Sequence, residues 1–391
     1  MTLPESRVLL VVGTRPEVIK MAPVLGALRE RYPALETRSV FTGQHTTLVK
    51  SVAAAFDFSP DYDLAIMRED QTIYDVVTSA SKGVADIIRD YRPNLLLVQG
   101  DTATVFAAAL AGYLEQVPLG HVEAGLRTTD KFSPWPEEGF RRLTDAITDL
   151  YFAPTARAGG LLQAENVPAE KVYVTGNTVV DALTYVAEQD LPIKNPTVRG
   201  FLEPLSEDHK VILVTAHRRE SFGEPLDRVF SAIRRLIEEH PSAHVIFPVH
   251  PNPNVYGPAH QALGSVDRVL LTDPLDYVDT IGVMQRVRLI LTDSGGIQEE
   301  APAFGVPVLV MRDVTERPEG IEAGVAQLVG TEIGRISDAV TKTLSGPRLK
   351  IRGNPYGDGQ AGVRIADIVH SFLTGAPRST KDWVGVDPIR P

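Results

Sequence analysis

The sequence has 391 residues and a formal net charge of −11, with 43% hydrophobic and 23% charged residues. This is an ordinary globular composition, and at about 100–200 residues per domain it predicts two domains. The acidic balance argues against general nucleic-acid binding, and the absence of cysteine excludes disulfides and thiolate chemistry. We expect a cytoplasmic protein, because no apolar run is long enough to span a membrane and the first residues do not resemble a signal peptide.

Short β-branched runs alternate with longer helical patterns from the start of the chain. The run 8–13 predicts a buried strand, and Pro16 lies where the following helix begins. Further strands of the first sheet are predicted at residues 95–99, 118–122, 151–153 and 172–175. Because these strands alternate with helical segments of about 10–15 residues, we expect a parallel sheet.

The same alternation restarts after residues 189–210, a segment rich in proline and charge that we interpret as part of a junction. The crossover itself is expected near residues 176–181. A second sheet is predicted from strands at 211–215, 245–249, 268–271, 289–292 and 306–310. The tail from Gly375 is expected to be loosely ordered. Two doubly wound α/β domains with a central cleft are the simplest architecture.

Ligands of such sheets bind outside the carboxyl ends of the strands, so the residues that follow strands are the candidates for a site. Arg15 follows the first strand at the mouth of a helix, where a phosphate is favoured, although a plain turn with Arg15 in solvent also fits. No G-x-G-x-x-G dinucleotide fingerprint is present there. Asp101 follows the strand at 95–99, where it can cap the next helix or project toward a ligand.

Two more carboxylates follow strands of the first sheet. Glu123 comes directly after the strand at 118–122, and Glu137 begins the helix after a loop stiffened by two prolines. Glu137 and Arg141 are four residues apart, so a surface ion pair is the alternative for them. Asp101, Glu123 and Glu137 together supply three carboxylates on one side of the sheet, as proton transfer at a weakly acidic carbon requires.

The second half carries a histidine and a glycine-rich turn at strand ends. His217 follows the strand at 211–215 beside two arginines, and it fits a general acid, a phosphate donor or a structural hydrogen bond. His250 is a weaker case of the same kind.

Ser294, Gly295 and Gly296 follow the strand at 289–292 and can present a hydroxyl and amides to a diphosphate. Glu300 can reach a ribose diol, and Arg317 adds positive charge. A glycine-rich turn before an amphipathic helix is the alternative.

Taken together, these strings resemble the non-hydrolysing UDP-N-acetylglucosamine 2-epimerase family over nearly the whole chain, from residues 13–23 to 316–319. The strings at 42–45, 99–102, 121–127, 216–220 and 293–296 occur in the same order as in the family. The resemblance implies a GT-B-like fold: two Rossmann-like domains around a central cleft. It places the N-terminal domain at residues 1–176, completed by a C-terminal helix at about 364–385, and the C-terminal UDP-binding domain at 177–363.

The resemblance also implies a reaction: reversible conversion of UDP-N-acetylglucosamine to UDP-N-acetylmannosamine, without NAD. We expect no obligatory metal, because the sequence shows no cluster of metal ligands. In the family a base removes the C2 proton and UDP leaves C1 by anti elimination. UDP then adds back to 2-acetamidoglucal while a proton reaches the opposite face of C2. The resemblance further implies a homodimer that supplies cell-surface polysaccharide synthesis, and it implies neither a nucleic-acid nor a membrane partner.

Roles are carried over by position. Asp101, Glu123 and His217 correspond to catalytic residues of the family, as does Glu137, which we expect to contact the sugar while Asp101 and Glu123 act around C2. The candidate substrate-binding residues are Arg15, Lys20, Arg141, His250, Ser294, Gly295, Gly296, Glu300 and Arg317.

One string departs from the family pattern. Gln44 and His45 are candidate regulatory residues, but they are followed by Thr46-Thr47-Leu48 instead of the arginine and second glutamine found in many bacterial members. This departure puts allosteric activation by the substrate in doubt.

Three other functions stay open: a hydrolysing epimerase that releases N-acetylmannosamine, a GT-B glycosyltransferase, and a non-catalytic UDP-sugar sensor. All of them share UDP binding.

Overall fold

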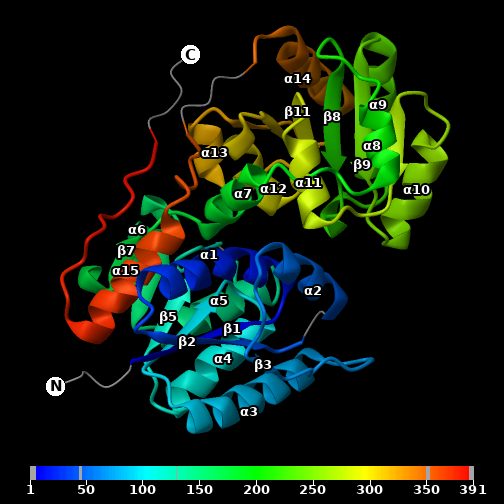
Figure 1. Cartoon of the computed structure of the whole chain (residues 1–391). Coiled ribbons are helices and arrows are strands. Elements are labelled where there is room, and N and C mark those ends of the chain that lie inside the picture. Colours follow the sequence, from blue (N-terminus) through cyan, green and yellow to red (C-terminus); the bar gives the residue numbers. More distant parts are fainter. Residues whose placement is uncertain (1–5, 44–45, 129, 349–352, 387–391) are drawn as a thin grey trace. The chain divides into compact units, whose positions relative to one another are not determined.

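The computed structural model describes residues 6–43, 46–128, 130–348 and 353–386, which fall into two compact units (Figure 1). The first unit comprises the chain up to Ala182 together with Tyr356–Gly385, and the second runs from Leu183 to Pro355. Each unit contains one parallel β-sheet with interleaved helices. The predicted pair of Rossmann-like α/β sheets is therefore confirmed.

The first unit has a seven-stranded sheet in the order β3-β2-β1-β4-β5-β6-β7. This is the doubly wound order, in which the chain starts centrally and builds outward in both directions. Its strands are β1 (Arg7–Val12), β2 (Glu36–Phe41), β3 (Tyr62–Asp63), β4 (Leu95–Gln99), β5 (Leu119–Val122), β6 (Leu150–Ala153) and β7 (Val172–Val174). Its helices are α1 (Arg15–Arg31), α2 (Thr46–Ala55), α3 (Ile73–Tyr91), α4 (Ala103–Leu114), α5 (Glu137–Asp145), α6 (Ala156–Ala164), α7 (Thr178–Glu188) and α15 (Ala361–Thr374), with α7 continuing into the second unit.

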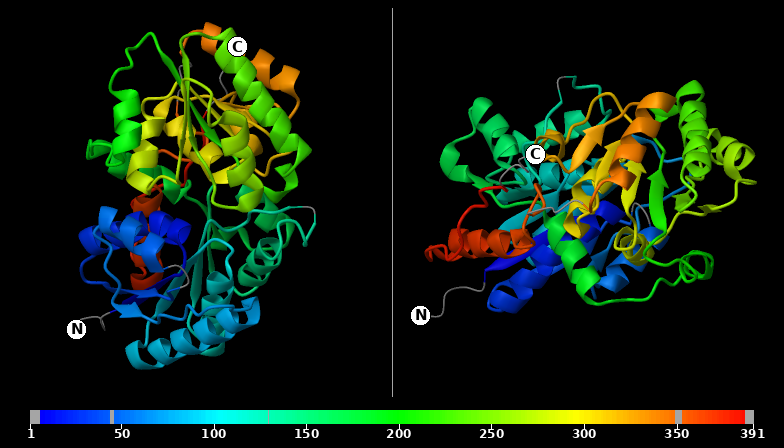
Figure 2. Two further views of the ribbon diagram at one scale, coloured as in Figure 1. Left: turned by 90° about the vertical axis from the view of Figure 1, so that its right-hand side faces the viewer. Right: turned by 90° about the horizontal axis from the view of Figure 1, so that it is seen from above.

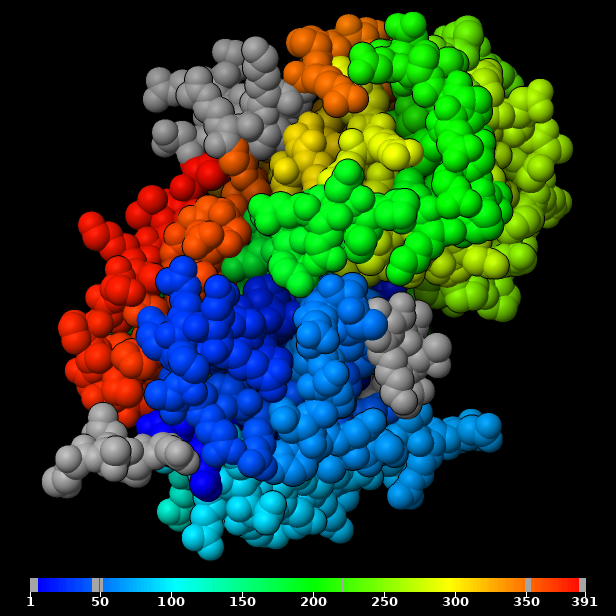
Figure 3. Space-filling view, in the orientation of Figure 1, coloured from blue at the N-terminus to red at the C-terminus, as the bar shows by residue number. Residues whose placement is uncertain are grey.

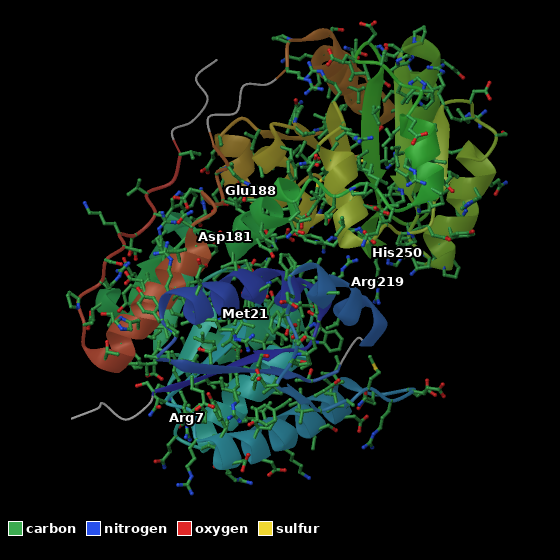
Figure 4. The ribbon with its side chains drawn as sticks, viewed as in Figure 1. Arg7, Met21, Asp181, Glu188, Arg219 and His250 are labelled. Atoms are coloured by element: carbon green, nitrogen blue, oxygen red, sulfur yellow. The ribbon has the colours of Figure 1, made fainter. Side chains whose placement is uncertain are left out.

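Helices cover both faces of this sheet (Figure 2). Leu9 of β1 and Leu96 of β4 pack on one face with residues of α3 and α4. The adjacent Leu10 and Leu97 are equally buried although neighbouring residues of a strand point to opposite faces. Continuous apolar runs such as these are typical of a parallel sheet that is covered on both sides. On α1, Met21 is completely buried (Figure 4).

The second unit has a six-stranded parallel sheet in the order β10-β9-β8-β11-β12-β13. Its strands are β8 (Lys210–Thr215), β9 (Ala243–Pro248), β10 (Val269–Thr272), β11 (Leu289–Thr292), β12 (Val308–Val310) and β13 (Ala326–Leu328). Its helices are α8 (Pro196–Leu202), α9 (Glu224–Glu239), α10 (Pro253–Leu263), α11 (Tyr277–Met284), α12 (Gly295–Glu300), α13 (Pro318–Glu322) and α14 (Ile333–Ser345). Residues 189–210, interpreted from the sequence as part of a junction, lie in this unit and include α8.

Helix α15 packs on α1 within the first unit. A Cβ atom on Gly362 would lie 2.8 Å from the backbone of Pro23, so the two helices approach closely only because this residue is glycine. The ring of His370 stacks on Tyr32 with centroids 4.2 Å apart, and the Tyr32 hydroxyl donates to Asp367 (2.9 Å). These contacts attach a segment from the end of the chain to the first helix.

The expectation of a loosely ordered tail is wrong for residues 375–385. The backbone N–H of Trp383 donates to the carbonyl of Val174 at the end of β7 (2.7 Å), and the indole is only 7% exposed. Asp367 accepts hydrogen bonds from the backbone N–H groups of Ser379 (2.9 Å) and Thr380 (2.7 Å). The segment lies along the surface of the first unit beside α15 (red in Figure 3). Within the described residues, no helix is long and apolar enough to cross a membrane.

Asp181 on α7 caps the start of α15 (Figure 4). Its carboxylate accepts hydrogen bonds from the backbone N–H groups of Ala361 (3.2 Å) and Gly362 (2.7 Å). Burial raises the pKa of Asp181 to about 7, although these two donors act in the opposite direction. The folded protein therefore holds a proton at Asp181 between about pH 4 and pH 7 that the unfolded chain releases.

We expect Asp181→Asn to gain stability relative to the unchanged protein as pH rises through this window. A carboxyl group with a raised folded-state pKa contributes stability at low pH and loses it as pH rises, whereas asparagine keeps an acceptor and does not ionise. The difference in free energy of unfolding should grow by up to about 1.4 kcal/mol per pH unit between pH 4 and pH 7. Urea unfolding at several pH values measures it, and a difference that does not change with pH would contradict the assignment.

Candidate functional site

Polar residues gather where three neighbouring strands of the first unit end. β1, β4 and β5 are adjacent and parallel, so the loops that follow them emerge at the same edge of the sheet. Asp101 and Glu123 lie in the loops after β4 and β5, and Arg15 begins the helix that follows the loop after β1. The placement follows the rule that ligand sites of parallel sheets lie outside the carboxyl ends of the strands.

Glu123 is held in a strained position by two neighbours. Its φ angle is +67°, in the left-handed region that non-glycine residues seldom adopt. Its carboxylate oxygens lie 2.6 and 2.8 Å from Nζ of Lys20 on α1, and one of them accepts a hydrogen bond from the Gln99 side chain at the end of β4. The Glu123 side chain is 6% exposed and the Lys20 side chain 13% exposed. The structure thus brings together two residues that the sequence analysis assigns to the site.

Asp101 pairs with the guanidinium of Arg141 on α5. Arg141 also lies 3.2 Å from Glu138, so the alternative of a surface ion pair between Arg141 and Glu137 is wrong. The alternative of a helix cap is wrong for Asp101 as well, because Thr102 occupies that position and accepts from the N–H of Val105 (3.3 Å). The Asp101 side chain keeps 27% exposure, which leaves its carboxylate open to a ligand.

The other two candidates of the first unit make fewer contacts. Glu137 is half-buried at the first position of α5 and Arg15 is half-buried at the first position of α1. Across the described residues, neither side chain forms an ion pair within 4 Å. Both charges are therefore available, but the structure does not bring Glu137 into contact with Asp101 or Glu123.

In the second unit, His217 is oriented by Asp293. The ring Nδ1 lies 3.0 Å from one carboxylate oxygen, and the other oxygen accepts from the backbone N–H groups of His217 and Arg218, both at 2.8 Å. Burial alone would raise the pKa of Asp293, but the contacts from His217 and Arg218 hold it below its usual value. The ring of His217 is 39% exposed, and with Nδ1 engaged its Nε2 is the nitrogen suited to proton transfer.

His250, in the loop after β9, lies beside His217. The two rings stack with centroids 5.9 Å apart, and Nδ1 of His250 accepts from the N–H of Asn252 (3.1 Å). Burial and the neighbouring His217 lower the pKa of His250. His217 and His250, which were predicted as separate candidates after different strands, therefore form one stacked pair.

The glycine-rich turn after β11 gathers the remaining candidates. A Cβ atom on Gly295 would lie 3.2 Å from the Arg317 guanidinium, whose Nε donates to Glu299 (2.8 Å). A Cβ atom on Gly296 would lie 3.9 Å from the Ser294 hydroxyl and 4.0 Å from the Glu300 carboxylate. A hydroxyl, a carboxylate and a guanidinium thus surround Gly295 and Gly296, which begin α12 and carry no side chains.

Several residues of these clusters received no role from the sequence. They are Glu17, Gln99, His121, Asp145, Asp293 and Glu299. Glu17 is 1% exposed, and burial raises its pKa to about 7 although Thr14, Gly13 and Thr102 all donate hydrogen bonds to it. Gln99 and Asp293 lie within the motifs at residues 99–102 and 293–296, at the ends of predicted strands. This position is the feature of the sequence that could have identified them. Gln44 and His45 lie outside the described residues.

A pocket of about 540 Å³ lies elsewhere in the second unit. Its lining includes Arg288, Val308 and Ala326, which stand at or just before the amino ends of β11, β12 and β13. Arg288 donates to the carbonyl of Gly346 (2.7 Å), the residue that ends α14, so capping of a helix accounts for this cation. The pocket is at the opposite end of the strands from the candidate residues and takes no part in the site.

Residues 27–370 match the family model described as UDP-N-acetylglucosamine 2-epimerase. The chain belongs to this family. It is 46% identical to the UDP-N-acetylglucosamine 2-epimerase of Yersinia pestis over 367 residues, which cover 92% of this chain and 97% of that protein. The Bacillus subtilis enzyme is 45% identical over 92% of this chain and 94% of its own length. The family resemblance predicted from the sequence is confirmed.

Solved structures agree with this assignment. The Neisseria meningitidis UDP-GlcNAc 2-epimerase bound to UDP-GlcNAc has a TM-score of 0.85 and 40% identity, covering 95% of this chain and all of that one. A 2-epimerase structure from Listeria monocytogenes reaches a TM-score of 0.88 with 40% identity over 97% of this chain and all of that one. A glycosyltransferase of kitacinnamycin, 12% identical with a TM-score of 0.62, shares the fold alone. The GT-B-like fold class is confirmed.

The Lys20–Glu123 pair gives a prediction for stability. Lys20→Met leaves Glu123 buried without its cation, which should lower the free energy of unfolding by about 3 kcal/mol. Adding Glu123→Gln to Lys20→Met removes the uncompensated charge and should restore part of that loss. Urea unfolding of the two single variants and the double variant measures both effects, and a double variant less stable than Lys20→Met would contradict this account of the pair.

Proposed function

We propose that this chain catalyses reversible epimerisation at C2 of UDP-N-acetylglucosamine to UDP-N-acetylmannosamine, by anti elimination of UDP through 2-acetamidoglucal and re-addition. Membership of the family supports the 2-epimerase activity. Relatives whose structures hold UDP or UDP-GlcNAc support the substrate. The observation that carries the mechanism is the presence of two carboxylates after adjacent strands, each paired with its own cation: Glu123 with Lys20, and Asp101 with Arg141.

Two separate carboxylates fit the chemistry at C2. One base takes the C2 proton, the C–H electron pair becomes the C1–C2 double bond, and the C1–O bond breaks as UDP leaves. In the reverse sense, UDP re-forms the C1–O bond while a proton is delivered to the other face of C2. Because inversion needs acid–base groups on both faces, Asp101 and Glu123 are assigned around C2, and Glu137 is assigned to the sugar. No step of this elimination and re-addition transfers a hydride, so the proposed mechanism does not use NAD.

The residues of the second unit are assigned to UDP. Ser294, Gly295 and Gly296 present a hydroxyl and unhindered backbone to the diphosphate, and the Glu300 carboxylate suits a ribose diol. Arg317, together with His217, stabilises the negative charge that develops on the departing diphosphate. Arg15 of the first unit is assigned to UDP by the family resemblance. Since the C2 hydrogen is only weakly acidic, this assistance to the leaving group is the larger part of catalysis.

The proposed assembly is a homodimer in the cytoplasm. Large apolar side chains of the first unit are exposed on α4 and α5, which pack against each other: Tyr113 is 60%, Leu114 66% and Leu143 52% exposed. Burying such side chains against a second copy is favourable. The product is proposed to supply cell-surface polysaccharide synthesis.

Proton NMR of the purified protein with UDP-N-acetylglucosamine in heavy water tests the proposed function. We expect UDP-N-acetylmannosamine to form and both epimers to carry deuterium at C2. Accumulation of free N-acetylmannosamine and UDP would establish hydrolysis instead. Unchanged substrate despite measurable UDP binding would contradict the activity.

Asp101→Asn is the matched variant for this experiment. It keeps the size of the side chain and removes the base, so kcat should fall by about 10²-fold or more. UDP affinity, measured by calorimetry, should change by less than about threefold because the assigned diphosphate contacts remain. An Asp101→Asn protein with nearly full kcat would exclude Asp101 from the chemistry.

A further inference from the structure

The short segment Gly100–Thr102, which carries Asp101, is fixed from both sides by buried polar groups that have no part in the proposed chemistry. Gly100 has a φ angle of +86°, so the backbone turns sharply just before Asp101. Thr102, on the other side, begins α4 as its cap. The direction of the Asp101 side chain therefore depends on how these two neighbours are held.

Glu17 holds the Thr102 side. One carboxylate oxygen of Glu17 accepts from the hydroxyls of Thr14 (2.7 Å) and Thr102 (2.9 Å), and the other accepts from the N–H of Gly13 (2.7 Å). Glu17 lies on α1, so it joins the loop after β1 to the loop after β4. With its oxygens occupied inside the protein and 1% exposure, Glu17 is not placed to touch a substrate.

His121 holds the Gly100 side. This β5 residue is 1% exposed, and its Nε2 lies 2.8 Å from the carbonyl oxygen of Gly100. A carbonyl only accepts, so Nε2 donates. Nδ1 lies 2.6 Å from Asp145, which also pairs with Arg127 at 2.7 Å and so keeps the imidazole ring in one orientation.

We propose that Glu17 and His121 are positioning residues for the epimerisation, which act through Thr102 and Gly100 to set the place of the Asp101 carboxylate. Three separate elements then converge on one residue: α1 through Glu17, β5 through His121, and α5 through the Arg141 guanidinium that binds Asp101. Small displacements of a catalytic base lower the rate strongly, because the base must reach its proton along a narrow range of directions. This inference rests on the proposed function.

A double-mutant cycle with Asp101→Asn distinguishes positioning from general stabilisation. Glu17→Ala and His121→Phe each remove the hydrogen bond, and each should lower kcat by about 10- to 100-fold with less than about threefold change in KM. In the Asp101→Asn background the same changes should lower kcat by less than about threefold, because there is no carboxylate left to position. Deuterium incorporation at C2 during long incubations supplies the residual rates.

A second pair of variants tests the same inference if the Glu17→Ala protein does not fold. Thr102→Val has nearly the same shape and breaks only the link from Glu17 to the segment, whereas Thr102→Ser retains the hydroxyl. We expect a tenfold or larger fall in kcat for Thr102→Val and less than about threefold for Thr102→Ser. The thermal midpoint of each variant reports folding independently.

Equal fold losses in the two backgrounds would overturn the inference, because Glu17 and His121 would then act independently of Asp101. A Thr102→Val protein that retains the kcat of Thr102→Ser would overturn it as well. If the unchanged protein converts UDP-N-acetylglucosamine while the cycle is additive, this inference alone fails. If the unchanged protein does not epimerise the substrate at all, the proposed function fails and this inference fails with it.

Discussion

A buried contact between Lys20, Glu123 and Gln99 connects the parts of the first unit on which the site depends. Lys20 comes from α1, Glu123 follows β5 and Gln99 ends β4, so three elements that are distant in sequence meet at one carboxylate. A buried charge is costly unless it is paired, and the left-handed backbone at Glu123 adds strain. The contact offsets both costs, and it places one candidate base beside the strand whose following loop carries the other, Asp101.

The second unit uses a related arrangement. Asp293 follows β11 and accepts the backbone N–H groups of His217 and Arg218, which follow the neighbouring strand β8. In both units a buried carboxylate thus joins segments at the carboxyl ends of two adjacent parallel strands. The reason is physical: the loops at the carboxyl ends of parallel strands contain free N–H groups and polar side chains, and a carboxylate satisfies several of them at once. In both cases the anchored loop carries a residue assigned to catalysis.

The sequence predicted the sheets well because their strands are apolar runs bounded by turns. Strand β2 was missed, since Glu36 and Arg38 interrupt its pattern, and the short strands β3 and β13 gave too little signal. The order of the tail could not be predicted, because Trp383 is buried only through contacts made elsewhere in the first unit. Packing of this kind is tertiary and leaves no local periodicity.

The positions of the candidate residues at strand ends were predicted from the sequence, but their contacts were not. Strand ends identified Asp101, Glu123, His217 and Ser294, because ligand sites of parallel sheets recur there. Whether Asp101 caps a helix or pairs with an arginine depends on Arg141, forty residues away on another helix, and no local pattern decides it. Glu17 received no role for the same reason. It lies just after the first strand, but its contact with Thr102 in the loop after β4 is visible only in three dimensions.

The most direct test of the elimination mechanism is positional isotope exchange in UDP-N-acetylglucosamine labelled with ¹⁸O in the bridge between C1 and the β-phosphate. If the C1–O bond breaks in every turnover, UDP separates from the sugar while both remain bound to the protein. The label should then spread from the bridge to the non-bridging oxygens of the β-phosphate as epimerisation proceeds. Phosphorus NMR detects the change in position. Epimerisation with the label retained entirely in the bridge would contradict cleavage of the C1–O bond and with it the assigned roles of both clusters.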